Sequence, residues 1–284
     1  MKHYHTGNDE MNDKLLTLQV QDIYSTIHHY MGKVIALANQ KGGVGKTTTT
    51  INIAAAVAVL GKNVLIIDSD PQANATSGVG VITEEDQLDV YDLIVHGEDP
   101  KAAIVETDTP NLSIIPSSID LVGADLELAS VLQREFRMKK VVDAVKDDYD
   151  YVFIDCLPSL GLITINALTA ADSVLVPVQC EFFSLEGYGK LKDTISLIQD
   201  SINPKLTIEG VVLSMYDKRL RMAKLVVSEV QDHVTDYVFD TIIHRNSKIG
   251  EAPSMGQPVI VYDAASKGAV NFMNLAAEFL ANNE

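Results

Sequence analysis

Residues 34–50, VIALANQKGGVGKTTTT, decide how the rest of the chain is interpreted. They begin as an apolar run typical of a buried strand, continue as a glycine-rich turn, and end in threonines that open a helix. Gly42, Gly43 and Gly45 let the backbone curl tightly and approach an anion without a Cβ in the way. Loop amides and the helix N-terminus then point hydrogen-bond donors at that anion. The segment therefore predicts a phosphate-binding loop.

The side chains at the end of this loop extend the prediction to a nucleotide. Lys46 supplies a cation for the β- and γ-phosphates, and the Thr47 hydroxyl can coordinate Mg²⁺. Val44 and Thr48 belong to the same turn and are included among the predicted nucleotide-binding residues. The usual pattern G-x-x-x-x-G-K-[ST] is not met, because Gln40 stands at its first glycine position. The alternative, a glycine-rich turn with solvated lysines, is disfavoured by the strand before it and the helix after it.

Composition limits the class of protein. The chain has 284 residues, of which 46% are hydrophobic, enough for a sizeable core. Its 2 cysteines, Cys156 and Cys180, form no CxxC pair, so a disulfide scaffold or a cysteine zinc site is not expected. No apolar run approaches the roughly 20 residues that a membrane span needs, and the start of the chain lacks a signal-peptide pattern. We predict a soluble, cytoplasmic protein.

The charge of the chain is unevenly distributed. A net charge of −17 argues by itself against nucleic-acid binding, because phosphates repel an acidic surface. Most of the excess lies in residues 81–130, however, and a basic group follows far downstream at Lys218, Arg219, Arg221 and Lys224. Net charge cannot decide whether the protein binds DNA, but a local basic patch can.

From residue 33 onward, apolar runs alternate with helical stretches. The predicted strands are 34–38, 64–67, 112–115, 151–154, 173–178, 208–214 and 237–243. The predicted helices are 45–60, 119–131, 135–146, 161–170, 184–201, 220–234 and 265–282. Most strand runs are continuously apolar, as in strands that are covered on both faces. The alternation predicts an α/β fold with a doubly wound, mostly parallel sheet and helices on both faces.

Residues 1–30 differ from the rest and are interpreted as an N-terminal extension before a single domain at 31–284. Within the extension, apolar residues recur at helical spacing over residues 13–30, which indicates an amphipathic helix. Those residues are Leu16, Val20, Ile23, Ile27 and Tyr30. The extension could regulate the domain that follows, bind a partner protein, or be upstream sequence that precedes a translation start at Met31.

Acidic residues follow two of the predicted strands. Residues 64–72, VLIIDSDPQ, deliver Asp68 and Asp70 at the carboxyl end of a buried strand, the edge where α/β sheets bind ligands. An aspartate-rich turn is the alternative reading of this segment. Residues 151–161, YVFIDCLPSLG, place Asp155 after four apolar residues, the form of a Walker B element that holds Mg²⁺. Asp68, Asp155 and the Thr47 hydroxyl are therefore the predicted metal-binding groups.

The run KGGVGKT at residues 41–47 resembles the deviant Walker A loop of the family that includes ParA, Soj and MinD. The resemblance extends over nearly the whole chain from Met31. It implies that Lys41 reaches across a dimer interface to the nucleotide of a second subunit, and that Asp70 orients the attacking water. By this resemblance Lys41, Lys46 and Asp70 are the catalytic residues. The family usually has proline where this chain has Leu157, and this departure could alter the stiffness of the switch loop that follows Asp155.

The same resemblance suggests where the base and DNA bind. The chain lacks the N-K-x-D sequence by which GTPases recognise guanine, so ATP is favoured. The adenine is expected near Met215, Arg245 and Asn246, beside a His244 that is commonly proline in the family. DNA contacts are expected at Arg219 and Lys248, which match basic positions of the family. Arg221 and Lys224 stand near Arg219 and are expected to contribute, with a solvated helix face as the alternative.

The resemblance implies an ATPase that forms a homodimer on ATP, binds double-stranded DNA nonspecifically and associates with the nucleoid. It also implies slow turnover, stimulation by a ParB-like centromere-binding protein, and a role in chromosome or plasmid segregation. A ParA-like ATPase that positions a protein cargo is the main alternative. A MinD-like membrane ATPase is less favoured, because the last helix lacks a basic face. An iron-sulfur function is disfavoured because the cysteines are wrongly placed.

Overall fold

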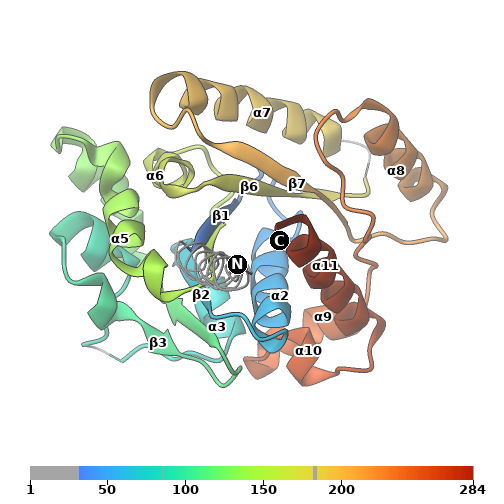
Figure 1. Cartoon of the computed structure of the whole chain (residues 1–284), viewed down its shortest axis with the longest axis horizontal. Helices are drawn as coiled ribbons and strands as arrows, with labels where there is room; N and C mark the ends of the chain where they lie inside the picture. Colours follow the sequence, from blue (N-terminus) through green and yellow to red (C-terminus); the bar gives the residue numbers. More distant parts are fainter. Residues whose placement is uncertain (1–31, 85, 182–183, 284) are drawn as a thin grey trace, which may run out of the picture.

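The computed structural model describes residues 32–84, 86–181 and 184–283. Their core is a seven-stranded sheet with the order β3-β4-β2-β5-β1-β6-β7 (Figure 1). The strands are β1 (Lys33–Leu37), β2 (Val64–Ser69), β3 (Val105–Glu106), β4 (Leu112–Ile115), β5 (Tyr151–Cys156), β6 (Ser173–Gln179) and β7 (Thr207–Ser214). All neighbours pair in parallel except the short edge strand β3, which is antiparallel to β4. The predicted doubly wound, mostly parallel sheet is confirmed.

Helices cover both faces of this sheet (Figure 1). They are α2 (Lys46–Val59), α3 (Asn74–Gly78), α4 (Ala124–Glu127), α5 (Arg137–Val145), α6 (Leu162–Ala170), α7 (Ser184–Ser201), α8 (Arg221–His233), α9 (Ser247–Glu251), α10 (Val259–Tyr262) and α11 (Lys267–Asn283). Short 3₁₀ or π turns are η1 (Asp92–His96), η2 (Pro100–Ala103), η3 (Ile119–Val122), η4 (Leu128–Ser130), η5 (Arg134–Phe136), η6 (Lys146–Asp148) and η7 (Ala252–Met255). Helices α5, α6 and α7 pack on one face, and α2 and α11 pack on the other.

Alternation along the central strands divides the core into two apolar clusters. In β1, Val34 and Ala36 join the cluster under α5 to α7, while Ile35 and Leu37 join the cluster under α2 and α11. Successive side chains of a strand point to opposite faces, so a strand between two layers must be apolar throughout. This requirement explains the continuous apolar runs that made the strands recognisable in the sequence.

The strand predicted over residues 237–243 is wrong. This segment runs beside β7, and Phe239 and Ile243 donate backbone hydrogen bonds to β7 carbonyls at 3.0 and 2.8 Å. Between them, the amides of Asp240 and Thr241 instead donate to the Glu278 carboxylate of α11, at 2.6 and 2.9 Å. The segment therefore makes a single isolated bridge to the sheet, between Val238 and Val211 of β7.

The helix predicted over residues 119–131 is a series of short turns, η3, α4 and η4. Gly123 lies between the first two, and glycine disfavours a continuous helix by about 1 kcal/mol relative to alanine. The short elements β3, α3, α9 and α10 were not predicted. The amphipathic helix expected over residues 13–30 lies outside the described residues.

A buried carboxylate joins the two ends of the described fold. Glu209 of β7, 6% exposed at its side chain, accepts from Lys33 at 2.5 Å, Ser173 at 2.6 Å and Asn283 at 2.7 Å. Burial raises the pKa of Glu209, but these donors outweigh it and hold the pKa below its usual value. The network links the first strand, two neighbouring strands and the last helix.

We predict that Glu209→Ala lowers the free energy of unfolding by about 2 kcal/mol, because three donors lose a buried acceptor. Urea denaturation at neutral pH measures the change. The exposed Glu106→Ala serves as the control and is expected to change stability little. Equal effects of the two substitutions would show that the network contributes nothing specific.

Candidate functional site

The glycine-rich loop connects β1 to α2 in the conformation that its sequence predicts. Gly43 and Gly45 have φ angles of +74° and +91°, a left-handed region that disfavours residues with a Cβ. A Cβ built on Gly43 would meet no atom within 4 Å, so the surface above the loop is open. The 14-residue helix α2 begins directly after the loop and directs its N-terminal amides toward this space. The backbone therefore forms a turn that is suited to an anion.

The two loop lysines occupy different environments. Lys46 is 6% exposed, and its ammonium donates to the Lys41 carbonyl at 3.3 Å. Burial lowers the pKa of Lys46, while the nearby Asp155, Cys156 and Asp70 oppose that shift. Lys41 is half-buried at the rim, where its stem lies close to Gly187 of α7. Lys46 therefore provides charge inside the loop, and Lys41 provides charge at its edge.

Two buried carboxylates lie beneath the loop. Asp68 of β2 and Asp155 of β5 are directly opposite each other on adjacent strands, and both are 0% exposed. Burial raises the pKa of each, and their mutual repulsion adds to the shift of Asp155. Thr50 donates to Asp155 Oδ1 at 2.8 Å, but Asp155 Oδ2 is buried without a hydrogen-bond partner among the described residues. A buried carboxylate oxygen without a donor is a strong site for a cation.

These groups fit Mg²⁺ better than a transition metal. The donors are the carboxylate of Asp155, the half-buried hydroxyl of Thr47 beside it, and Asp68 behind them. Over the described ranges, no three His, Cys, Asp or Glu side chains gather closely enough to hold a metal by themselves. Mg²⁺ usually takes one or two carboxylates and completes its shell with water and phosphate oxygens. The predicted metal residues Thr47, Asp68 and Asp155 are thus brought together.

Asp70 lies immediately beyond the end of β2. Its backbone amide donates to Asp68 Oδ1 at 3.2 Å, and its own Oδ1 accepts from the Gln72 amide at 3.0 Å. The half-buried carboxylate is close enough to Lys46 to favour the charged ammonium. Local turn hydrogen bonds thus hold Asp70 just beyond the carboxyl end of β2, and its role in orienting water stays a prediction.

A pocket adjoins the glycine-rich loop and contains the residues that are expected near adenine. Its volume is about 230 Å³, and an apolar floor dominates its lining. The lining residues are Gly45, Thr48, Thr49, Ser214, Met215, Ile243, His244, Arg245, Asn246, Ile249, Gly250 and Phe272. Because Gly45 of the loop and Thr48 of the first turn of α2 form one wall, a molecule bound there lies next to the glycine-rich loop.

The backbone that lines this pocket has one uncommon conformation, at Met215, and one hydrogen bond to α11, at His244. Met215 has a φ angle of +54°, an uncommon conformation for a side-chain-bearing residue that is often retained at functional sites. His244 donates its backbone amide to Asn271 Oδ1 at 3.1 Å, a bond that the proline common at this position could not make. The departure at His244 therefore replaces proline rigidity with a hydrogen bond to α11.

Comparison with known proteins agrees with this geometry. Residues 32–208 match the family model described as AAA domain. Sporulation initiation inhibitor protein Soj of Bacillus subtilis is 50% identical over 252 residues, covering 89% of this chain and 100% of that protein. The chain belongs to the ParA/Soj family.

Two further relatives of this ParA/Soj chain support the assignment. Chromosome partitioning protein ParA of Caulobacter vibrioides is 45% identical over 252 residues, covering 88% of this chain and 94% of that protein. A solved structure of cobyrinic acid a,c-diamide synthase from Mycobacterium smegmatis, with a bound ATP analog and magnesium, is 36% identical with a TM-score of 0.77. The match covers 88% of this chain and 94% of that structure.

The DNA residues predicted from the ParA/Soj resemblance fall on two elements. Arg219 lies before α8, is 81% exposed, and pairs with Asp217 at 2.6 Å. Arg221 and Lys224 are exposed on α8, and neither has an ion-pair partner among the residues that the structure describes. Lys248 belongs to α9, where it pairs with Glu251 at 2.8 Å. The structure thus groups three of the four cations and leaves Lys248 on a separate helix.

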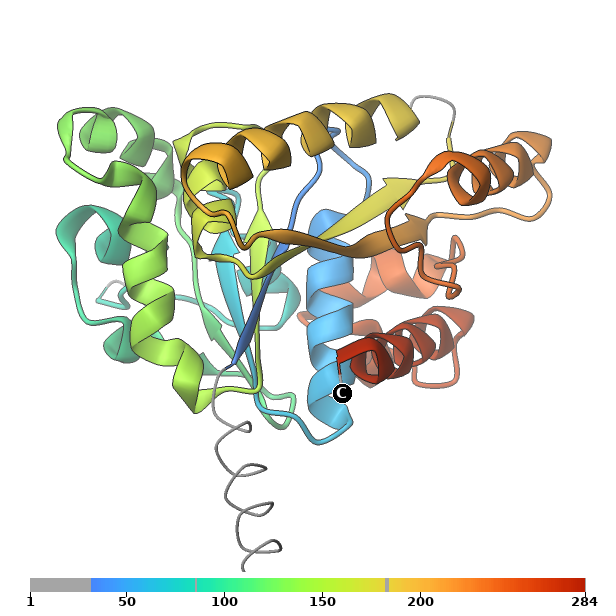
Figure 2. The ribbon, with the colours of Figure 1, turned by 45° about the horizontal axis from the view of Figure 1, so that its top comes forward.

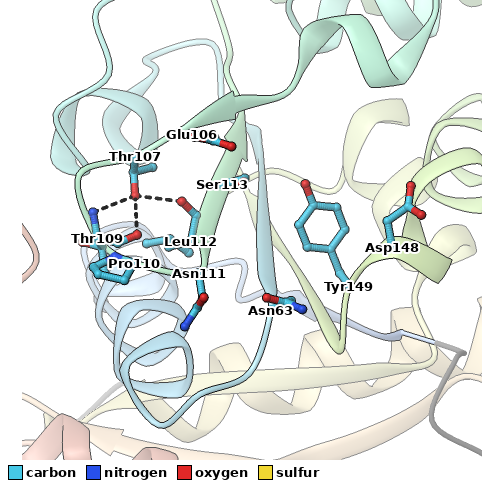
Figure 3. Close-up of a pocket in the computed structure, with 10 residues that line it drawn as sticks. All are labelled: Asn63, Glu106, Thr107, Thr109, Pro110, Asn111, Leu112, Ser113, Asp148 and Tyr149. Carbon is cyan, nitrogen blue, oxygen red and sulfur yellow. Dashed lines mark hydrogen bonds between the residues drawn. The ribbon is translucent and has the colours of Figure 1, made fainter. Parts of the chain in front are cut away.

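A larger pocket of about 460 Å³ lies at the opposite edge of the sheet and contains none of the predicted site residues (Figure 3). Tyr149 and Asp148 line one side, and the turn after β3 lines the other. Thr107 fixes that turn by donating to the Leu112 carbonyl at 2.9 Å and accepting from the Thr109 amide at 3.2 Å. This pocket faces away from the ParA/Soj phosphate loop.

Several supporting residues were not predicted. Thr76 holds Asp68 through its amide at 2.9 Å and its hydroxyl at 2.8 Å. Ser214 donates to the Val44 carbonyl at 2.8 Å, and Asn39 accepts from the Lys41 amide at 3.0 Å. Thr50, which donates to Asp155, is the one supporting residue with a signal in the sequence, because it lies one helical turn from Lys46 in the threonine run.

No helix in the part of the chain that the structure describes has the length and apolar character required to traverse a bilayer. The last helix, α11, is packed against the core, since Phe272, Leu275 and Phe279 are all buried.

We predict that Asp155→Asn stabilises the nucleotide-free protein more at high pH than at low pH. Burial raises the pKa of Asp155 to about 7, so the folded state keeps a proton that the unfolded state has lost. Stability therefore falls as pH rises from the ordinary aspartate range toward that value. The amide side chain of the variant cannot ionise, so the variant does not lose stability over this pH range.

Thermal unfolding in EDTA measures the effect. The Tm gain of the variant over the parent is expected to be roughly 5 °C larger at about pH 8 than at about pH 5, since 1 kcal/mol shifts Tm by about 2–4 °C at this size. The exposed Asp120→Asn is the control. A gain that does not depend on pH would contradict the assignment.

Proposed function

We propose that the chain is an ATP-dependent, dimerising ATPase that binds DNA nonspecifically and drives chromosome or plasmid segregation with a ParB-like centromere-binding partner. The observation that carries the proposal is the loop of Lys41 and Lys46 above the buried pair Asp68 and Asp155. The identity of 50% with Soj supports the same function.

ATP and Mg²⁺ are the proposed ligands. The loop amides and Lys46 are suited to a triphosphate, and the pocket beside Thr48 and Met215 is suited to a base. Mg²⁺, once bound, would neutralise phosphate charge and satisfy the orphan oxygen of Asp155. The related structure that carries an ATP analog and magnesium supports both ligands.

Hydrolysis depends on positioning and charge more than on covalent chemistry. Lys46 balances negative charge on the transferring phosphoryl group. Asp70, at the end of β2, orients a water for attack on the terminal phosphate. Asp68 stays behind the reacting atoms, where Thr76 fixes its carboxylate. The role of Asp70 rests on the family resemblance, and its place just beyond β2, close to Lys46, supports it.

Dimerisation would complete the site. Lys41 lies at the rim of the loop, and its ammonium has no ion-pair partner among the described residues. It is therefore available to a nucleotide held by a second subunit, which would make hydrolysis depend on the dimer. A dimer would also pair two basic surfaces at α8, so that two weak DNA contacts act together. The protein would then act in the cytoplasm, associated with the nucleoid.

We predict that Asp70→Ala retains ATP binding and loses at least about 100-fold in hydrolysis, because the attacking water is no longer oriented. Phosphate release with and without DNA and the ParB-like partner measures turnover, and equilibrium dialysis measures ATP retention. Asp86→Ala, an exposed aspartate away from the loop, is the control. Unchanged turnover in Asp70→Ala would refute the assigned role.

We predict that Arg219→Glu weakens DNA binding by at least about tenfold at moderate salt while ATP-dependent dimerisation persists. The side chain is 81% exposed, so the fold does not depend on it. Fluorescence anisotropy with mixed-sequence DNA measures affinity, and sedimentation measures the dimer. The matched control is Lys205→Glu, an exposed charge reversal before β7. Equal loss in both variants would indicate an effect of net charge alone.

A further inference from the structure

The described chain begins at Gly32, which lies in a narrow slot beside the start of β5. A Cβ built on Gly32 would lie within 2.5 Å of the carbonyl oxygens of Lys146 and Tyr149. Only glycine fits this slot without a shift of the backbone. Residues 1–31 therefore join the domain directly beside Tyr149.

Tyr149 also lines the pocket of about 460 Å³ at this edge of the sheet (Figure 3). Burial raises the pKa of its phenol; the Ser113 hydroxyl opposes this shift, and Asp148 and Glu106 add to it. Asp148 is paired with Lys101 at 2.6 Å, whereas Glu106 has no ion-pair partner among the residues that the structure describes. The pocket therefore favours hydrogen-bond donors and cations over anions.

A pair of apolar side chains borders the pocket. Asn111, which lines it, donates from its side chain to the Ala58 carbonyl near the end of α2, at 3.3 Å. The next two residues of that helix end, Val59 and Leu60, are 52% and 43% exposed. An acidic pocket and an uncovered apolar surface thus lie next to each other.

The end of the N-terminal extension has the complementary chemistry. Residues 23–31, IYSTIHHYM, contain no aspartate or glutamate. His28 and His29 supply ring N–H donors, and each can carry a positive charge. Ile27 and Tyr30 flank them with apolar surface. The segment can therefore satisfy both the carboxylates and the apolar pair.

The place where the extension joins the domain brings this segment to the pocket. An extended chain spans about 3.3–3.6 Å per residue, so residues 28–31 can reach roughly 13 Å from Gly32. That reach is enough to enter a pocket that Tyr149, the neighbour of Gly32, lines. A short tether also gives an effective concentration on the order of millimolar, so weak contacts suffice for docking.

We propose that this pocket holds residues 28–30 of the chain's own N-terminal extension, folded back against the edge of the sheet opposite the phosphate loop. A histidine ring N–H would donate to Glu106, and the Tyr30 ring would cover Val59 and Leu60. This docking involves neither ATP nor DNA, and it therefore goes beyond the proposed function.

Other occupants satisfy fewer of these groups. Nucleic acids and anionic lipids are repelled by the carboxylates of the pocket. A small free cation would satisfy Glu106 but would leave Val59 and Leu60 uncovered. The extension of a second copy has the right chemistry but lacks the tether, so it would compete only at high protein concentration.

A single fluorescent reporter tests the proposal in the full chain. The sequence contains no tryptophan, so Tyr30→Trp introduces the one tryptophan of the protein. Acrylamide should quench it with a constant at least about threefold lower in the native chain than in the denatured chain. Equal constants in the two states would overturn the proposal.

Pocket variants of Tyr30→Trp show whether the pocket gives this protection. Asn63→Arg with Asp148→Arg places two cations at exposed lining positions and should raise quenching to that of the denatured chain. The matched control, Gln231→Arg with Asp232→Arg, makes the same chemical changes at exposed positions of α8 and should leave the tryptophan protected. Equal quenching in the two double variants would contradict docking in this pocket.

A second measurement leaves the pocket residues unchanged. His28→Ala with His29→Ala should speed hydrogen exchange of the turn at residues 107–111 by at least about threefold, because the turn loses its cover. The matched control, His3→Ala with His5→Ala, should exchange as the parent does. All four substitutions lie in the extension, so damage to the pocket cannot explain a difference. Identical exchange in both variants would refute the assigned contacts.

Dilution distinguishes the chain's own extension from that of a second copy. Quenching of Tyr30→Trp should stay constant over about a tenfold dilution, because a tethered segment does not depend on protein concentration. Protection that is lost on dilution would assign the pocket to a second copy and overturn the proposal. None of these measurements involves ATP hydrolysis, so the docking and the proposed function can fail independently.

Discussion

Two carboxylates buried side by side dominate the physics of this protein. Asp68 and Asp155 are paired across adjacent central strands, where no water can hydrate them. Burial of like charges is costly unless cations or donors compensate. Thr50 and Thr76 compensate only in part, and Lys46 and a divalent cation would supply the rest. The fold thus holds a negative centre that favours a cation-bound nucleotide.

The local sequence was sufficient to predict the structure of a segment that contains all of its own structural determinants. The loop of residues 34–50 carries its strand, its left-handed glycines and its helix start together, so its conformation was predictable. Residues 237–243 show the opposite case. Their β-like composition predicted a strand, but Glu278, far along the chain, takes the amides that a ladder would need. A distant competitor of this kind leaves no local signal.

The residues of the candidate site likewise divide into those that the local sequence predicts and those that it does not. The positions of Asp68 and Asp155 were predictable because each directly follows an apolar run near the carboxyl end of a parallel strand, and Asp70 comes two residues after Asp68. Thr76 and Asn39 were not, because their roles exist only once other segments fold beside them. The base pocket joins Thr48 to residues near 215 and 245, and only family resemblance connected such distant segments beforehand.

The contact between Lys33 and Asn283 has a practical consequence for engineering the chain. The first strand begins, and the last helix ends, at the edge of the sheet opposite the phosphate loop (Figure 2). A short linker could join these positions in a circularly permuted protein with new termini in a surface loop. For the same reason, a fluorescent protein attached after the last helix would project away from the nucleotide.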